Sequence, residues 1–344
     1  MRAMILAAGY GTRLWPLTID RAKPAIPFMG RPLVGYVAEY LAHYGFSDVV
    51  VNLHHRSESV RAALGDGSRF GVQLHYVEEP VILGTSGALD NARTLLEGDA
   101  FVVINGKLAT DIDLGEALAT HRRTGALATL VLRSNVARER YSIVRVRDGL
   151  VEGFGGFPES DNAGSAPGAA QHANGEDATQ EEGMETPLMF TGIQILDPRI
   201  FSFIPRGVFS HTVTDVYIPA LKAGERIAAH VAGGYWYELS TVKRYLETSL
   251  ELLKHKGREL EVCAGAHVEP GADVRESVLW EDVEVSEGAS VRRCVLGAGV
   301  VVGRGEVLEN AAVVRADLVV GAERPEKGLD GEVRGSNFVA PLPE

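Results

Sequence analysis

Short runs of apolar residues alternate with amphipathic stretches over about the first 135 residues. The apolar runs predict buried strands at 3–7, 48–53, 72–77, 100–104 and 128–132. Apolar positions with a 3.6-residue period predict helices over 33–44, 85–96 and 114–123. This alternation is typical of an α/β fold with a mostly parallel sheet covered on both faces. Ligands of such sheets bind at the carboxyl ends of the strands.

The composition changes sharply over 159–187, where Gly, Ala, Ser, Asn, Glu and Gln replace the aliphatic residues. This composition predicts a disordered or mobile loop. After it, the pattern predicts a strand at 190–196, a helix near 215–222, a strand at 235–239 and a helix at 241–256.

The C-terminal region contains a six-residue apolar repeat. Its members are Val262, Val268 and Val274, then Leu279, Val285 and Val291, then Leu296, Val302, Leu308 and Val314. The series repeat after 17 residues, and glycines at 271, 288 and 305 share that offset. Such a period predicts a short parallel β-helix of about three coils, with glycines at tight corners. After about Val320 the chain is polar, and we expect it to cover the last coil or to fray.

The sequence thus predicts two domains, 1–258 and 259–344. The net charge of −12 argues against a surface for nucleic acid or for an anionic membrane. No segment reaches the roughly 20 apolar residues that span a bilayer. The two cysteines lack metal-ligand spacing and fit a reducing compartment, so we expect a cytoplasmic protein.

A glycine-rich loop directly follows the first predicted strand. Gly9 and Gly11 allow backbone N–H groups to approach an anion, and Arg13 adds a fork of donors for phosphate oxygens. Lys23 supplies a second positive charge. A dinucleotide-binding motif needs a third glycine where Leu14 stands, and a P-loop needs Gly-Lys-Ser/Thr, which is absent. A purely structural turn would not need Arg and Lys at these positions.

The stretch 6–33 resembles the signature of the sugar-1-phosphate nucleotidyltransferases, also called nucleoside-diphosphate-sugar pyrophosphorylases. The matching positions are Gly9, Gly11, Thr12, Arg13, Pro16, Leu17, Thr18, Lys23, Pro24, Pro27, Pro32 and Leu33. Residues 79–89 resemble the family's base-recognition segment, 190–193 its sugar-contacting strand and 234–246 the segment with its second metal ligand. The C-terminal repeats resemble the left-handed β-helix of the mannose-1-phosphate guanylyltransferases.

This resemblance implies a Rossmann-like nucleotidyltransferase fold and a catalytic role for Arg13 and Lys23. The nucleotide-binding residues that it implies are Leu6, Ala7, Ala8, Gly9, Gly11, Thr12, Arg13, Glu79, Gly84, Thr85 and Asn105. The implied sugar-phosphate residues are Tyr141, Ser142, Thr191 and Gly192. In the family, a sugar 1-phosphate attacks the α-phosphate of a nucleoside triphosphate, and catalysis is positioning plus neutralisation of charge.

The sequence departs from the family pattern at four places. The family has an Asn-Gly-Asp motif whose Asp holds Mg²⁺, whereas this sequence has Asn-Gly-Lys, with Lys107 in place of the Asp. The second metal ligand, an Asp in the family, corresponds to Glu238. The lysine that binds the sugar phosphate has no counterpart in 153–158, and Ser142 stands where the family places a glycine near the sugar.

Two hypotheses account for the altered metal positions. Two carboxylates with Mg²⁺ have zero net charge, as does a Lys107–Glu238 pair, so Lys107 is a candidate catalytic residue that replaces part of the metal's charge. Alternatively, Asp111 and Glu238 bind a displaced Mg²⁺. The non-catalytic interpretation of Lys107 is a solvated lysine at a strand end, and that of Glu238 is a structural carboxylate. Asp111 and Asp113 precede a helical run, and either is a candidate N-cap.

The sequence therefore predicts nucleotidyl transfer from a nucleoside triphosphate to a sugar 1-phosphate, with GDP-mannose-type chemistry favoured. The alternative is a non-catalytic homologue that binds a nucleotide or a nucleotide sugar and regulates a partner. A third possibility, a β-helix acyltransferase using His267, needs a longer stack of coils than this chain has. We expect a homo-oligomer, because exposed β-helix sides commonly pack against copies.

Overall fold

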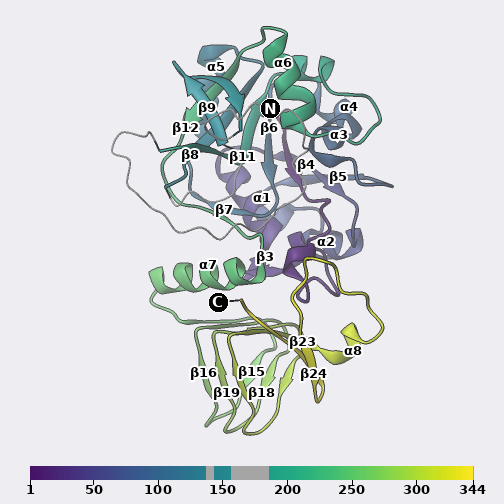
Figure 1. The fold of residues 1–344 in the computed structure, drawn as a ribbon, viewed down its shortest axis with the longest axis vertical. Helices are drawn as coiled ribbons and strands as arrows, with labels where there is room; N and C mark the ends of the chain where they lie inside the picture. Colours follow the sequence, from purple (N-terminus) through teal and green to yellow (C-terminus); the bar gives the residue numbers. More distant parts are fainter. Residues whose placement is uncertain (137–142, 156–185, 344) are drawn as a thin grey trace.

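The computed structural model describes residues 1–136, 143–155 and 186–343 (Figure 1). The loop predicted at 159–187 lies almost entirely outside the described residues, as do Tyr141 and Ser142. An α/β part forms the upper portion in Figure 1, helix α7 (Val242–His255) runs beneath it, and stacked strands form the lower portion.

The described residues form a sheet in the order β5-β4-β1-β6-β11-β8-β12-β10-β9. Its strands are β1 (Ala3–Leu6), β4 (Asp48–Leu53), β5 (Gln73–Glu78), β6 (Phe101–Asn105), β8 (Ala128–Ser134), β9 (Ile143–Arg147), β10 (Leu150–Phe154), β11 (Leu188–Leu196) and β12 (Ile227–Val231). The strands β5, β4, β1 and β6 are parallel, as predicted. However, β11 runs antiparallel to both β6 and β8, so the α/β fold has a mixed sheet rather than a mostly parallel one.

Helices cover both faces of this sheet. They are α1 (Leu33–His43), α2 (Ser57–Leu64), α3 (Gly84–Asn91), α4 (Arg93–Leu96), α5 (Leu114–Thr124) and α6 (Ile218–Lys222). Successive side chains of a strand point to opposite faces. Ile5 therefore packs with α1 and α5 in one buried cluster, and Met4 packs with α3 and α6 in another. The predicted helix over 85–96 is interrupted at Ala92, where α3 ends and α4 begins.

A two-stranded ladder joins two segments of the α/β part that are far apart in the sequence. Strand β7 (Leu108–Thr110) pairs antiparallel with β13 (Trp236–Glu238), so that Glu238 lies opposite Leu108. The N–H of Leu239 donates to the carbonyl of Lys107 at 3.0 Å. This ladder places residues that are distant in sequence at one edge of the site described below.

The C-terminal strands form three faces of a parallel stack. One face holds β14 (Leu260–Val262), β17 (Ser277–Leu279), β20 (Val295–Leu296) and β23 (Ala311–Arg315). The second holds β15 (His267–Val268), β18 (Glu284–Val285) and β21 (Val301–Val302), and the third β16 (Asp273–Arg275), β19 (Ser290–Arg292) and β22 (Val307–Glu309). Pairing of Leu260 with Ser277 and of Asp273 with Ser290 confirms the predicted 17-residue coil.

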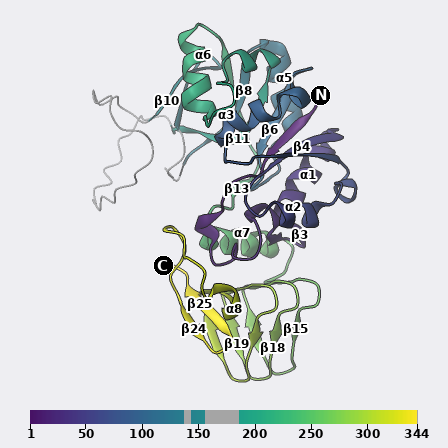
Figure 2. The ribbon, with the colours of Figure 1, turned by 90° about the vertical axis from the view of Figure 1, so that its right-hand side faces the viewer.

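The predicted inward positions from Leu279 onward are buried, but the three in the first coil, Val262, Val268 and Val274, are not. Leu279 and Leu296 are 0% exposed, whereas Val262 is 41% exposed. Val262 belongs to the first coil, which has no further coil beyond it to cover its apolar side chains. The last coil is covered as expected, because β25 (Asn337–Pro341) pairs antiparallel with β23 and carries β24 (Glu332–Arg334) on its other edge; α8 (Ala316–Val319) lies beside it. Figure 2 shows these strands at the end of the stack.

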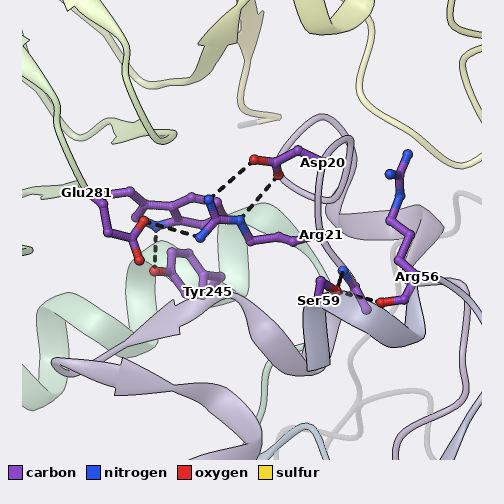
Figure 3. Close-up of polar contacts among 8 residues, drawn as sticks. Asp20, Arg21, Arg56, Ser59, Tyr245 and Glu281 are labelled. Atoms are coloured by element: carbon purple, nitrogen blue, oxygen red, sulfur yellow. Dashed lines mark hydrogen bonds and ion pairs between the residues drawn. The ribbon is translucent and has the colours of Figure 1, made fainter. Parts of the chain in front are cut away.

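The two parts are joined by a packed interface, in which Trp280 is 1% exposed. Its Nε1–H donates to the Tyr245 hydroxyl at 3.0 Å, and that hydroxyl donates to the carbonyl of Pro27. Arg21 binds Asp20 and Glu281 (Figure 3). Its guanidinium also lies over the Trp280 ring, 5.0 Å from the ring centroid. A cavity of about 700 Å³ lies beside these contacts. Among the described residues, no helix is long and apolar enough to cross a membrane.

Candidate nucleotide-binding site

The glycine-rich loop leaves β1 at its carboxyl end, between the ends of β4 and β6. Gly11 has a φ of +68°, and a Cβ at this position would lie 2.9 Å from the Cβ of Lys23. The left-handed conformation and the close approach both require glycine here. The loop is thereby folded onto the segment that carries Lys23.

This loop forms much of the wall of a cavity of about 350 Å³. The lining residues are Leu6, Ala7, Gly9, Tyr10, Gly11, Thr12, Arg13, Lys23, Pro24, Gly106, Lys107 and Ser240. The structure therefore brings together eight of the predicted site residues: Leu6, Ala7, Gly9, Gly11, Thr12, Arg13, Lys23 and Lys107. Tyr10 and Ser240 are additional lining residues that the sequence did not single out. Tyr10 is 47% exposed, and its ring lies 5.5 Å from those of His54 and His55.

Three cationic side chains belong to this cavity, and none of the described residues that line it carries a carboxylate. Lys23 is 9% exposed. Burial, and to a lesser extent the nearby Lys107 ammonium, lower the pKa of Lys23 well below its usual value; Glu238 opposes and Arg13 adds to this shift. A cluster of like charges that repel one another binds a polyphosphate well, because the anion relieves the repulsion.

A buried polar network holds the glycine loop to the base-recognition segment. Asn52, at 3% exposure, accepts a hydrogen bond from the N–H of Ala7 at 2.8 Å and donates to Glu79 Oε1 at 2.6 Å. The other carboxylate oxygen of Glu79 accepts from the N–H of Leu83 at 2.9 Å. Glu79, which is 2% exposed, thus orders two loops, and its predicted contact with a nucleotide stays a prediction. Sequence reasoning missed Asn52, although a buried Asn in an apolar strand was a signal for such a network.

Gly84 and Thr85 begin α3 and lie against a neighbouring loop. Gly84 has a φ of +74°, and a Cβ here would lie 2.4 Å from the carbonyl oxygen of Ser210. The hydroxyl of Thr85 accepts from the N–H of Thr212 at 2.9 Å. Neither Gly84 nor Thr85 lines the 350 Å³ cavity, nor does Ala8, and their predicted contacts with base and ribose remain untested by the geometry.

The predicted sugar-contacting strand lies beside the end of β6. Gly192 has a φ of +81°, and a Cβ here would overlap the amide of Asn105, so the structure brings these two predicted residues together. Thr191 is 1% exposed, and its hydroxyl donates to the carbonyl of Val131 at 2.7 Å. The Thr191 side chain is therefore directed into the sheet. Tyr141 and Ser142, the other two sugar-phosphate candidates, lie outside the described residues.

The two altered metal positions meet in an ion pair. The Lys107 ammonium contacts the Glu238 carboxylate; their side chains are 32% and 11% exposed. Asp111 lies opposite Tyr235, three residues along the ladder from the Glu238 position, and its carboxylate accepts from the N–H of Tyr235. Three strand residues span roughly 10 Å. The structure does not bring Asp111 and Glu238 together.

The donor set present does not fit a Mg²⁺ site. Magnesium prefers several oxygen ligands in an octahedral arrangement. Glu238 offers a carboxylate that is already paired with an ammonium, and the described part of the chain contains no group of three His, Cys, Asp or Glu side chains able to hold a metal. Asp113 is occupied in a structural role, because it caps α5 by accepting from the N–H groups of Gly115 and Glu116. This confirms the N-cap expected at Asp113.

An anion-binding loop at the carboxyl end of a central parallel strand, with arginine and lysine beside it, defines a nucleotide-binding α/β protein. Comparison with known families is more specific. Residues 2–255 match the nucleotidyl transferase family, and residues 254–332 match the GlmU-like C-terminal hexapeptide family. The chain belongs to the nucleotidyl transferase family.

Two curated relatives and one solved structure illustrate this membership. The chain is 29% identical to a UTP–glucose-1-phosphate uridylyltransferase of Synechocystis, over 83% of this chain and 72% of that protein. It is 28% identical to a mannose-1-phosphate guanylyltransferase of Mycobacterium tuberculosis, over 78% and 72%. Its fold is similar to a structure from Bacillus anthracis assigned as a glucose-1-phosphate thymidylyltransferase, with a TM-score of 0.59 and 22% identity over 73% of this chain and 94% of that one.

Proposed function

We propose that this protein transfers a nucleotidyl group from a nucleoside triphosphate to a sugar 1-phosphate, releasing pyrophosphate. The observation that carries the proposal is the single cavity in which the glycine loop, Arg13, Lys23 and Lys107 converge. Its charge suits a triphosphate and its place in the fold suits a nucleotide. Membership in the nucleotidyl transferase family supports the reaction class.

The chemistry needs no covalent enzyme intermediate. A phosphate oxygen of the sugar 1-phosphate attacks the α-phosphorus, and the bond from that phosphorus to the bridging oxygen of the β-phosphate breaks. The electron pair leaves with pyrophosphate. The loop N–H groups and Arg13 hold the triphosphate, and Lys23 neutralises charge on its phosphates. Positioning and charge neutralisation supply the catalysis.

GTP with mannose 1-phosphate is the pair that we propose first. The mannose-1-phosphate guanylyltransferase of M. tuberculosis shares most of its length with this chain. The uridylyltransferase of Synechocystis makes UTP with glucose 1-phosphate the main competitor. A cytoplasmic location and a homo-oligomeric state stay predictions.

The test measures pyrophosphate release by the purified protein from a panel of nucleoside triphosphates, each paired with each of several sugar 1-phosphates. We expect turnover with one or two pairs. Arg13→Gln should lower kcat/KM by about 100-fold, because it removes a charged donor to phosphate. The control is Arg304→Gln in the β-helix, whose guanidinium binds Glu287 at an exposed position and which should leave turnover unchanged.

A second function is favoured by the Lys107–Glu238 pair, which departs from the family pattern: a homologue that binds a nucleotide and regulates a partner without turnover. Thermal unfolding distinguishes the two. A nucleotide that raises the melting temperature, in a protein that releases no pyrophosphate with any pair, would favour the regulatory function. If no nucleotide changes the melting temperature, both functions are wrong.

A further inference from the structure

The ion pair between Lys107 and Glu238 lies at the edge of the phosphate cavity. Lys107 lines the cavity, whereas Glu238 does not. The backbone of the pair is fixed by the β7–β13 ladder and by the hydrogen bond from the N–H of Leu239 to the Lys107 carbonyl. Glu238 is 11% exposed, so its carboxylate is held largely away from water behind the ammonium. The carboxylate therefore holds the ammonium of a residue that lines the cavity.

Within residues 1–136, 143–155 and 186–343, the surroundings of the pair offer no second carboxylate that would turn it into a metal site. Asp111, the remaining candidate ligand, is engaged with Tyr235 roughly 10 Å along the ladder. Asp111 lines a different cavity, together with Tyr36 and Tyr40. A divalent ion bound at Glu238 would also have to displace the Lys107 ammonium. An ammonium already occupies the place where the ion's charge would act.

We propose that Lys107, oriented by Glu238, is the resident cation of this site and that the protein binds and uses its nucleotide without a divalent metal ion. The inference rests on the proposed function only for the identity of the polyphosphate. The ion pair is neutral, as a divalent ion between two carboxylates would be. On binding, phosphate oxygens contact the exposed side of the ammonium, and Arg13 and Lys23 supply the remaining positive charge. Lys107 is thus a catalytic residue and Glu238 a positioning residue.

The central experiment compares the wild-type protein with Lys107→Asp, which places two carboxylates where the ion pair was. Binding of Mn²⁺ alone is followed by electron paramagnetic resonance, and binding of a fluorescent GTP analogue is measured in EDTA and in Mg²⁺. The wild-type protein should bind no Mn²⁺ and should bind the nucleotide with the same affinity, within about 3-fold, in both buffers. Lys107→Asp should bind Mn²⁺ and should need metal for tight nucleotide binding, with an affinity loss in EDTA of about 10-fold or more.

Turnover adds a second readout. Pyrophosphate release by the wild-type protein should persist in EDTA, whereas that of Lys107→Asp should fall by about 100-fold in EDTA and recover in part with Mn²⁺. Glu238→Gln should lower kcat while the KM for the nucleotide changes by less than about 2-fold, because Glu238 does not line the cavity. The matched control is Lys222→Asp on the exposed face of α6, which should leave every readout unchanged. If Lys107→Asp does not fold, Lys107→Gln replaces it, because this substitution removes the positive charge without adding a negative one. Lys107→Gln should lose nucleotide affinity equally in EDTA and in Mg²⁺.

The possible results separate this inference from the proposed function. Loss of wild-type nucleotide affinity or turnover in EDTA, with recovery in Mg²⁺, overturns the metal-free site but leaves nucleotidyl transfer standing. Metal-independent nucleotide binding without turnover supports Lys107 as the resident cation of the binding site, but it overturns the proposed function and the catalytic role of Lys107. Wild-type binding of Mn²⁺ alone at the site overturns the inference. Absence of nucleotide binding under every condition overturns both.

Discussion

Replacing Asn52 with leucine tests whether the buried network holds the glycine loop. Leucine has a similar volume but cannot accept from the N–H of Ala7 or donate to Glu79. A buried N–H left without a partner costs about 1–3 kcal/mol, and a lost bond to a charged acceptor about 1.5–3 kcal/mol. The better burial of leucine offsets part of this loss. We expect the free energy of unfolding to fall by about 3 kcal/mol.

The same substitution should weaken nucleotide binding, because Ala7 lines the cavity and Asn52 holds its backbone. We expect a melting temperature about 6 °C lower and a KM for the nucleoside triphosphate about 10-fold higher. Differential scanning calorimetry and pyrophosphate release measure these two effects. The matched control is Asn91→Leu, since Asn91 is exposed and donates to a carbonyl at 2.9 Å; its loss should cost less than about 1 kcal/mol.

Asn52→Asp refines the test by keeping the shape and changing the charge. Its carboxylate would lie against that of Glu79, where the amide now donates at 2.6 Å. Two carboxylates in contact share a proton at low pH and repel one another at high pH. The Asn52→Asp protein should therefore be less stable at pH 8 than at pH 5, relative to wild type. The network would have no role in the loop if Asn52→Leu matched Asn91→Leu in both stability and KM.

Three further predictions concern the domain interface, the buried lysine and the thiols. Tyr245→Phe leaves the Trp280 Nε1–H and the Pro27 carbonyl without their partner, and it should lower the free energy of urea unfolding by about 2–4 kcal/mol. The control is Tyr237→Phe, which removes a hydroxyl that donates to an exposed carboxylate and should cost less than about 1 kcal/mol. Equal costs would contradict a role of Tyr245 in the interface. The pKa of Lys23 is lowered in the folded protein, so between that value and ~10.4 the unfolded chain binds more protons than the folded one. The stability of the nucleotide-free protein should therefore rise with pH in this range, and Lys23→Met should reduce that rise. A pH series with the same slope for both proteins would contradict the reasoning. Burial raises the pKa of Cys263 to about 12 and that of Cys294 to about 11, so iodoacetamide at pH 8 should modify both far more slowly than it modifies the urea-unfolded chain; equal rates would refute the burial.

The periodic parts of the fold could be predicted from the sequence. The strand at 48–53 is observed at the predicted bounds, and the coil length of 17 residues reappears in the pairing of β14 with β17. The three strands β9, β10 and β12 were not predicted. The antiparallel direction of β11, which makes the sheet mixed, was also not predicted. A strand's direction in a sheet depends on distant partners, so local apolar periodicity does not contain it.

The glycine loop and its cations were also evident from the sequence. Gly11, Arg13 and Lys23 lie close together along the chain, and their chemistry is limited to a few arrangements around an anion. The structure adds the reason for the glycine at 11, which is the contact with Lys23. Asn52 received no role from the sequence, because its two partners lie in other segments of the chain.

The sequence by itself determined the elements with a regular period and the local phosphate-binding loop, since backbone geometry converts spacing directly into a buried face or a tight turn. The sequence left open whether Glu238 pairs with Lys107 or shares a metal with Asp111, and tertiary structure decided for the Lys107 pair. Tertiary structure also decided that Val262 is left exposed at the open end of the stack. These outcomes depend on which distant segments pair. Strand pairing and packing set those contacts, and no short stretch of the chain encodes them.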